Sequence, residues 1–191
     1  MRKSREEAAE TRRRIIASAA GEFRRHGIAA TGLAEIMAAA GLTHGGFYRH
    51  FASKGQLVAE ASAAALAGVT ERMEEAAASR KSPRKGLKAA VERYLSPTHR
   101  DAPSEGCPLA ALGSELARAD TDTREIATAG FLKLVDTIAG GFDGVRRDAA
   151  RARAIAAVST LVGALTMARI VTDEALSEEI LRAARESILD A

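Results

Sequence analysis

The chain has 191 residues, of which 47% are hydrophobic and only 4% aromatic, and alanine is the most frequent of the apolar types. Because alanine is the best helix former, this composition favours an all-α protein packed through small side chains. The single cysteine, Cys107, excludes an internal disulfide and a Cys-rich metal site, and the lack of a signal core or of about 18 consecutive uncharged apolar residues predicts a cytoplasmic protein with no membrane association.

Charge is distributed unevenly along the chain. The formal net charge is +3, but residues 1–55 contain ten Lys/Arg and five Glu, whereas the remainder contains eighteen Lys/Arg and twenty acidic residues. A basic N-terminal quarter favours a polyanionic partner at that end of the molecule. The alternative is a basic helix that is merely solvated.

The N-terminal quarter predicts three helices. The first opens at a capping box, Ser4 to Glu7, and ends at Gly27, and its apolar residues recur at helical spacing. A short second helix covers 33–40 and ends at Gly41, and a third begins after Thr43 as its cap. Two short helices joined by a tight turn are typical of a DNA-binding helix-turn-helix, in which the second of them enters the major groove.

The rest of the chain predicts a larger helical bundle. A second capping box, Ser53 to Gln56, begins a long helix that runs toward Arg80 and bridges two domains, 1–52 and 53–191. Beyond a polar break and around one long loop at 97–108, further helical patterns follow at 85–96, 108–119, 122–142, 147–171 and 173–189. We therefore expect about nine helices and no strands.

The stretch from Ala39 to Lys54, Ala-Ala-Gly-Leu-Thr-His-Gly-Gly-Phe-Tyr-Arg-His-Phe-Ala-Ser-Lys, resembles the DNA-binding signature of the TetR family of bacterial repressors. The resemblance covers residues 10–60 closely, and the C-terminal part only in length and helix count. It implies a homodimer with two N-terminal heads on double-stranded operator DNA. It also implies a C-terminal body that binds a small-molecule effector and thereby spreads the heads.

Nine residues of the head are expected to contact DNA. His44 is the leading base reader, Arg49 reads a guanine or a phosphate, and the family pattern places Tyr48 and Lys54 on the sugar-phosphate backbone. Other readings stay open, since Thr43 can cap its helix, His50 can pack within the head, and Gly45 can mark a loop instead of a close approach to DNA. The full set is Thr31, Thr43, His44, Gly45, Phe47, Tyr48, Arg49, His50 and Lys54.

An effector site in the body is expected among bulky residues and the cysteine, and the alternative for each is a place in the core: Met73, Tyr94, Cys107, Phe131, Leu134 and Met167. Cys107 also suggests an oxidant effector. As the N-cap of a helix, with His99 and Arg100 nearby in sequence, its thiolate would be favoured and therefore reactive. The alternative is a buried cysteine that only packs.

Dimerisation is expected through the helical hairpin at 147–189, which with its two-fold copy would make a four-helix interface. Packing within one chain is the alternative for its apolar residues. The candidates are Ile155, Val158, Val162, Leu165, Ile180, Leu181 and Ile188.

Enzymatic motifs are missing from the sequence. There is no phosphate loop, no metal-spaced His/Glu cluster and no Gly-x-Ser-x-Gly elbow, so we expect no enzyme, no cofactor and no metal. The favoured function is a ligand- or redox-responsive dimeric transcriptional regulator that acts as a repressor. Two alternatives are a helical protein-binding adaptor without DNA binding and a thiol hydrolase built on Cys107 and His99.

Overall fold

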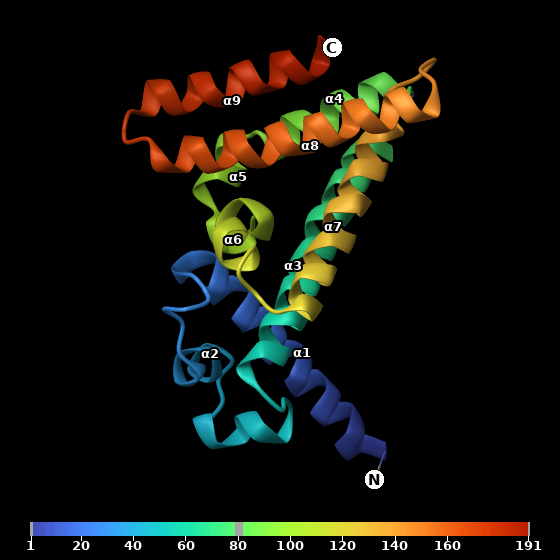
Figure 1. Ribbon diagram of the computed structural model, residues 1–191. Helices are drawn as coiled ribbons and strands as arrows, with labels where there is room; N and C mark the ends of the chain where they lie inside the picture. The colour runs from blue at the N-terminus through green and yellow to red at the C-terminus, as the bar shows by residue number, and fades with distance from the viewer. Residues whose placement is uncertain (1, 79–81, 191) are drawn as a thin grey trace.

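The computed structural model describes residues 2–78 and 82–190, and the chain is helical in both ranges, with no strand among these residues (Figure 1). The expected all-α class with about nine helices is confirmed. Nine α-helices and two 3₁₀ helices follow one another in the described residues: α1 (Arg2–His26), α2 (Leu33–Ala39), η1 (His44–Arg49), α3 (Lys54–Ala78), α4 (Pro83–Tyr94), α5 (Pro97–Asp101), η2 (Pro103–Glu105), α6 (Pro108–Leu116), α7 (Thr121–Ala139), α8 (Arg147–Ile170) and α9 (Glu174–Leu189).

Local signals explain most helix boundaries. Four helices of the C-terminal part, α4, α5, α7 and α9, begin where the side chain of an N-cap residue accepts a hydrogen bond from a backbone amide of the first turn; the caps are Ser82, Ser96, Asp120 and Asp173. In the head, Gly27 and Gly41 take the positive φ angles, 86° and 69°, that follow a helix end.

Several expected boundaries differ from the observed ones, and one lies outside the described residues. Helix α1 begins at Arg2, ahead of the predicted box at Ser4. The predicted end of the long helix, Arg80, lies outside the described residues, and α3 is described as far as Ala78. The stretch at 97–108 is not one loop, because Pro97 and Pro103 each begin a short helix, α5 and η2.

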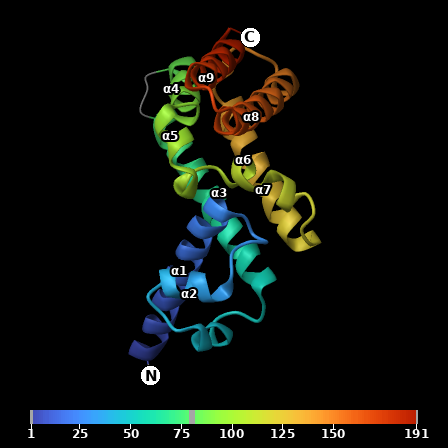
Figure 2. The same cartoon turned by 90° about the vertical axis from the view of Figure 1, so that its left-hand side faces the viewer.

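The helices form a head and a body joined by α3. Helices α1 and α2 and the 3₁₀ turn η1 make the small head at the bottom of Figure 1, and α8 and α9 lie across the opposite end as an antiparallel hairpin (Figures 1 and 2). Helix α3 rises from the head and packs along α7 and α4. Two hydrophobic clusters occupy the two parts, and α3 contributes Leu57 and Ala61 to the head cluster but Val69 and Met73 to the body cluster.

Helix α4 approaches α3 very closely. A Cβ added to Gly86 would lie 2.7 Å from the backbone oxygen of Ala77, so only glycine fits at this crossing. The contact limits how α3 and α4 can cross, and both helices contribute residues to the wall of one pocket.

Candidate nucleic-acid interface and effector site

The reading segment, residues 43–50, contains η1 at the tip of the head. The sequence predicted an α-helix here, and the structure corrects this to a 3₁₀ helix. Two of its six residues, Gly45 and Gly46, are poor α-helix formers, whereas short 3₁₀ turns tolerate such sequences. Thr43 occupies the N-cap position with extended backbone, but its hydroxyl makes no capping hydrogen bond and so stays available to another partner.

The outer side of the reading segment is exposed and polar. Tyr48 is 69% exposed although it is aromatic, and a Cβ added to Gly45 would meet no atom within 4 Å. None of the described residues therefore requires glycine at this position, which agrees with close approach by another molecule. Five of the nine predicted DNA contacts are exposed here, and the side chain of His50 is half-buried beside them; the five are Thr43, His44, Gly45, Tyr48 and Arg49.

Phe47 was expected to contact DNA, and the structure corrects this. Its ring is fully buried in the head and stacks on the ring of Phe51 with centroids 5.6 Å apart. Tyr48 packs edge-on against the same ring at 5.1 Å. Phe47 thus supports the exposed residues from beneath.

Thr31 and Lys54 were also expected to face DNA, and both are used inside the head. Thr31 is 1% exposed and donates its hydroxyl proton to the carbonyl oxygen of Gly27 at 2.6 Å. The Lys54 ammonium donates to the carbonyl oxygens of Ile28 and Thr31, each at 2.7 Å. These bonds fasten the start of α3 to the turn between α1 and α2. The role of the buried Thr31 is therefore corrected to a structural one, whereas a phosphate contact by the half-buried Lys54 stays a prediction.

Arg12 holds the reading segment to two helices, and sequence patterns did not reveal this role. From α1 its guanidinium pairs with both carboxylate oxygens of Glu60 on α3, at 2.5 Å each. It also lies 4.6 Å from the ring centroid of Phe51 and donates to the carbonyl oxygen of His50 at 3.4 Å. Arg12 thus joins α1, α3 and the end of the reading segment.

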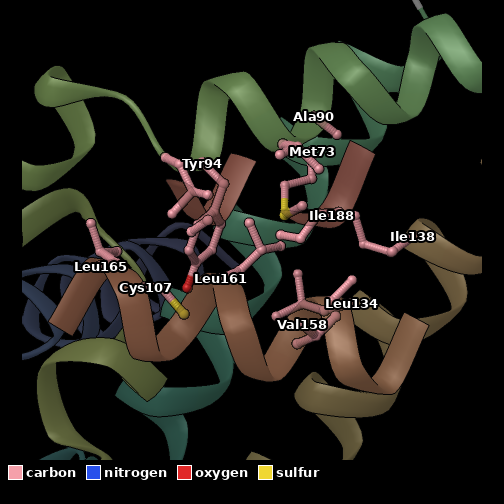
Figure 3. Close-up of a cluster of buried hydrophobic side chains, with 14 of the residues drawn as sticks. Met73, Ala90, Tyr94, Cys107, Leu134, Ile138, Val158, Leu161, Leu165 and Ile188 are labelled. Atoms are coloured by element: carbon pink, nitrogen blue, oxygen red, sulfur yellow. The ribbon is translucent and has the colours of Figure 1, made fainter. Parts of the chain in front are cut away.

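The body interior places Tyr94 against Cys107. The Tyr94 hydroxyl points toward the Cys107 sulfur (Figure 3), and it is buried without a hydrogen-bond partner of good geometry in the described residues. Burial is the main cause that raises the pKa of both groups. Cys107 does occupy the N-cap position of α6, as predicted, but it is 0% exposed. The expectation of a reactive thiolate is therefore wrong, because burial outweighs the helix dipole.

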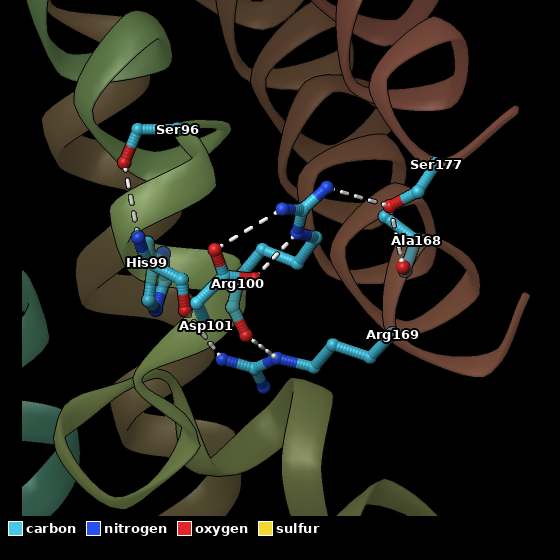
Figure 4. A network of polar contacts seen from close by, with 7 residues as sticks. All are labelled: Ser96, His99, Arg100, Asp101, Ala168, Arg169 and Ser177. Atoms are coloured by element: carbon cyan, nitrogen blue, oxygen red, sulfur yellow. Dashed lines mark hydrogen bonds and ion pairs between the residues drawn. The ribbon is translucent and has the colours of Figure 1, made fainter. Parts of the chain in front are cut away.

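Helix α5 is fastened to its surroundings by His99 and Arg169. His99 donates from Nδ1 to the carbonyl oxygen of Tyr94 at 2.7 Å and accepts the Cys107 amide proton at Nε2 at 3.0 Å. Burial lowers the pKa of His99 to about 4; the bond to Tyr94 opposes the shift, and nearby arginines add to it. Arg169 of α8 donates to the carbonyl oxygens of His99 and Arg100 at 2.7 and 3.0 Å (Figure 4).

Most of the expected effector residues are core residues. Met73, Tyr94, Cys107 and Leu134 belong to one buried cluster, against which Phe131 packs. Met167 is not among them, because it is 47% exposed on the outer side of α8. Its expected place in an effector site is wrong.

A pocket of about 370 Å³ lies between α3, α4, α5 and η2. Met73 and Tyr94 are the only predicted effector residues in its lining. Sequence patterns missed its polar residues, because three of them come from α5 and η2, where a loop was expected. The lining consists of Val69, Arg72, Met73, Arg93, Tyr94, Ser96, Thr98, His99, Ala102 and Glu105.

The α8–α9 hairpin divides the predicted dimer residues into two groups. Val158, Leu165, Leu181 and Ile188 are buried in the body cluster of their own chain, so we correct their expected role. Ile155, Val162 and Ile180 are exposed or half-buried.

The outer stripe of α8 is apolar and made of small and medium residues. At helical spacing it comprises Ile155, Ala156, Ser159, Val162, Gly163, Thr166, Met167 and Ile170. A Cβ added to Gly163 would meet nothing within 4 Å, and Ile170 is 63% exposed. In the described residues, α8 is also the one helix long and apolar enough to cross a membrane by length and composition alone. The stripe therefore needs a partner surface.

Two family models match the chain, one in each part. The model of the tetR family of bacterial regulatory proteins matches residues 15–61, which form most of the head. The model of the C-terminal domain of LmrA/YxaF-like transcriptional regulators matches residues 83–186.

Individual relatives divide in the same way. The HTH-type transcriptional regulator TtgR of Pseudomonas putida is 47% identical over 58 residues, which are 30% of this chain and 28% of TtgR, so the chain matches less than a third of that relative. An uncharacterized HTH-type transcriptional regulator of Mycobacterium tuberculosis is 31% identical over 172 residues, 85% of this chain and 86% of the relative. The crystal structure of a TetR transcriptional regulator from Chloroflexus aurantiacus is 30% identical, covers 100% of this chain and 96% of its own, and superposes with a TM-score of 0.76.

Proposed function

Because this chain belongs to the TetR family of bacterial regulatory proteins, we propose that it is a dimeric DNA-binding transcriptional repressor whose body binds a small-molecule effector. The observation that carries the proposal is the reading segment. Its apolar residues are buried beneath it, while the residues that can reach base edges and phosphates are exposed on one side, next to a glycine that no internal contact requires.

The outer stripe of α8 supports the proposed dimerisation. The opposite side of α8 packs into the core of its own chain, and the stripe contains the exposed Ser159 and Gly163, which suit close contact between helices better than contact with lipid. Helix α9 exposes Leu176 and a half-buried Ile180 at matching spacing. Two copies of the hairpin would bury both stripes and give the protein two heads for two half-sites.

An effector acts if it binds the body better in a conformation that fits DNA worse. The pocket between α3, α4, α5 and η2 is a suitable place, because α3 and η2 both contact α1 of the head. Linkage then requires that the effector weaken DNA binding by the same factor by which DNA weakens effector binding. Repression would be relieved by the effector, in the cytoplasm.

Fluorescence anisotropy tests the proposal. The protein is titrated into a labelled duplex from the region upstream of the gene and, separately, into a scrambled duplex, each at several salt concentrations. About eight phosphate contacts in a dimer predict that log K falls with log salt at a slope near −7, and the upstream duplex should bind at least about 1,000-fold more tightly. A slope near zero on both duplexes would contradict the proposal and favour the adaptor.

A further inference from the structure

The pocket between α3, α4, α5 and η2 is lined by two cationic side chains that lack a carboxylate partner. Arg72 of α3 donates one hydrogen bond, to the backbone oxygen of Glu105 at 2.7 Å, and the guanidinium of Arg93 of α4 has no hydrogen bond or ion pair in the described part of the chain. Glu105 is the one acidic side chain in the lining, and it is exposed at η2, with no ion pair among the described residues. Two guanidinium groups are thus left to bind an outside anion.

The wall behind the pocket adds more positive charge. Arg24 of α1 and Arg169 of α8 are both partly buried, and their own pKa values are lowered chiefly because burial removes them from water. Together with Arg72 they oppose protonation of His99, whose pKa is already lowered by burial to about 4. One Nη1 atom of Arg169 is buried without any partner in the described residues. The imidazole therefore stays neutral, and the arginines keep the local potential positive.

The floor of the pocket is apolar. Val69 and Met73 come from successive turns of α3, and the Tyr94 ring closes the inner side, with all three side chains nearly fully buried. A volume of about 370 Å³ lies near the lower end of the range of small-molecule sites, about 300 to 1,000 Å³. The lining thus combines guanidinium donors with a modest apolar surface.

We propose that this pocket binds a small carboxylate with an apolar body, held at its carboxylate by Arg72 and Arg93 and at its body by Val69, Met73 and Tyr94. Guanidinium groups match a carboxylate in shape and donate charge-assisted hydrogen bonds to it. The assignment rests on the proposed function, since it names the chemical class of the effector.

The same pocket has a direct connection to the head. Arg24 of α1 donates from Nε to the carbonyl oxygen of Ser104 in η2 at 2.8 Å, and from a second nitrogen to the same oxygen. Arg72 of α3 holds the next carbonyl oxygen of η2, that of Glu105. A carboxylate that draws Arg72 away releases one of these two links, so η2 and α1 shift together and the head moves with them.

Isothermal titration calorimetry without DNA tests the ligand class. The probes are acetate, hexanoate, decanoate and benzoate, each compared with its uncharged primary amide. We expect at least one acid to bind at least tenfold more tightly than its amide, with hexanoate or benzoate tighter than acetate, and to lose at least tenfold in Arg72→Gln and in Arg93→Gln. Arg118→Gln, an exposed arginine outside the pocket, is the matched control and should bind as the wild type does.

The result that would overturn the assignment is equal binding of acid and amide, no binding of any probe, or acid binding that both substitutions leave unchanged. The guanidinium of Arg93 makes no hydrogen bond or ion pair to the described residues, so its substitution keeps the test sound even if Arg72→Gln fails to fold. Because DNA is absent, failure here leaves the proposed DNA binding standing, and loss of DNA binding leaves this test standing.

A second measurement addresses the connection to the head. Arg24→Lys keeps the positive charge but replaces the two-pronged donation to Ser104. In the wild type, the tightest acid should weaken DNA binding at least tenfold; in Arg24→Lys, less than threefold, with calorimetric affinity unchanged. Arg25→Lys, the next residue on α1, is the control. An equal response in Arg24→Lys would contradict the route through η2.

Discussion

The head and the body of this protein distribute their polar and apolar groups between surface and interior in opposite ways. The head hides its aromatic rings and exposes a polar reading segment, with Tyr48 and Arg49 outermost. The body exposes the apolar stripe of α8 and keeps arginines and a neutral histidine near its interior. Each part therefore suits a different partner. The head suits a polyanion. The body suits a second apolar helix pair at its outer surface and a small anion in its pocket.

The largest effect is expected at the outer stripe of α8. If a substitution there had no effect, the contrast drawn between the head and the body would fail. Met167→Glu places a carboxylate in the proposed interface, where two copies would have to bury it without a partner. We expect the dissociation constant of the dimer to rise about 1,000-fold, which is about 4 kcal/mol, and the affinity for the operator to fall with it. Sedimentation equilibrium measures the first and anisotropy the second. Ala129→Glu on α7, also exposed, is the control; unchanged dimerisation in Met167→Glu would contradict the interface.

The same helix marks how far sequence reasoning reached. Periodicity and caps are local, so they predicted most of the helices and the paired-helix arrangement of the head, but not the 3₁₀ form of η1 or the short helices α5 and η2. They did not predict which side of α8 faces inward, because the helix is apolar nearly all round; Val158 and Met167 looked interchangeable in sequence and lie on opposite sides. Orientation depends on packing against α6, α7 and α9, which the periodicity of a single helix does not encode.

The pocket was predicted in part, for a similar reason. Met73 and Tyr94 are bulky residues on predicted helices, and bulk alone suggested them. Arg72 and Arg93 carry no such signal, since arginines on helices are usually solvated. For Lys54 the family pattern predicted a phosphate contact but gave no sign of its two hydrogen bonds to the backbone of the turn.

The second prediction concerns the interior of the body and its pH dependence. His99 has a folded pKa of about 4 against 6.5 in the unfolded chain, so the unfolded state binds more protons between these values. The contribution of neutral His99 to the free energy of unfolding is therefore fully present above pH 6.5. It is lost as pH falls toward 4, which lowers the free energy of unfolding by about 3 kcal/mol. Urea unfolding of wild type and His99→Gln at several pH values measures the difference. The exposed His26→Gln is the control, and parallel curves for wild type and His99→Gln would contradict a neutral buried histidine.

The third prediction concerns the outer face of the head. Arg49→Ala should weaken operator binding about 100-fold, about 2.7 kcal/mol, because each head loses one cationic contact. The salt dependence then sharpens the assignment: an unchanged slope with relaxed sequence selectivity indicates a base contact, and a shallower slope a phosphate contact. Arg25→Ala, at the far end of α1 and paired with Glu22 at 2.9 Å, is the control. Unaltered affinity in Arg49→Ala would remove this residue from the interface.

The fourth prediction concerns the interior of the head, where the smallest effect is expected. Lys54→Met leaves the carbonyl oxygens of Ile28 and Thr31 without their donor and should cost about 2 kcal/mol of unfolding free energy, measured in urea. Lys88→Met is the matched control, since its ammonium lies 3.7 Å from Glu92 on an exposed helix face and should cost under about 0.5 kcal/mol.

DNA affinity of the Lys54→Met protein decides between the two roles of this residue. A structural lysine predicts less than a threefold change in affinity per folded molecule, whereas a phosphate contact predicts a tenfold loss, a shallower salt slope and unchanged stability. Only the first result agrees with a head whose charges divide cleanly between an outer set that meets the polyanion and an inner set that holds the turn. The second would mean that the turn opens on DNA, and that the head, like the body, changes its internal contacts when its partner binds.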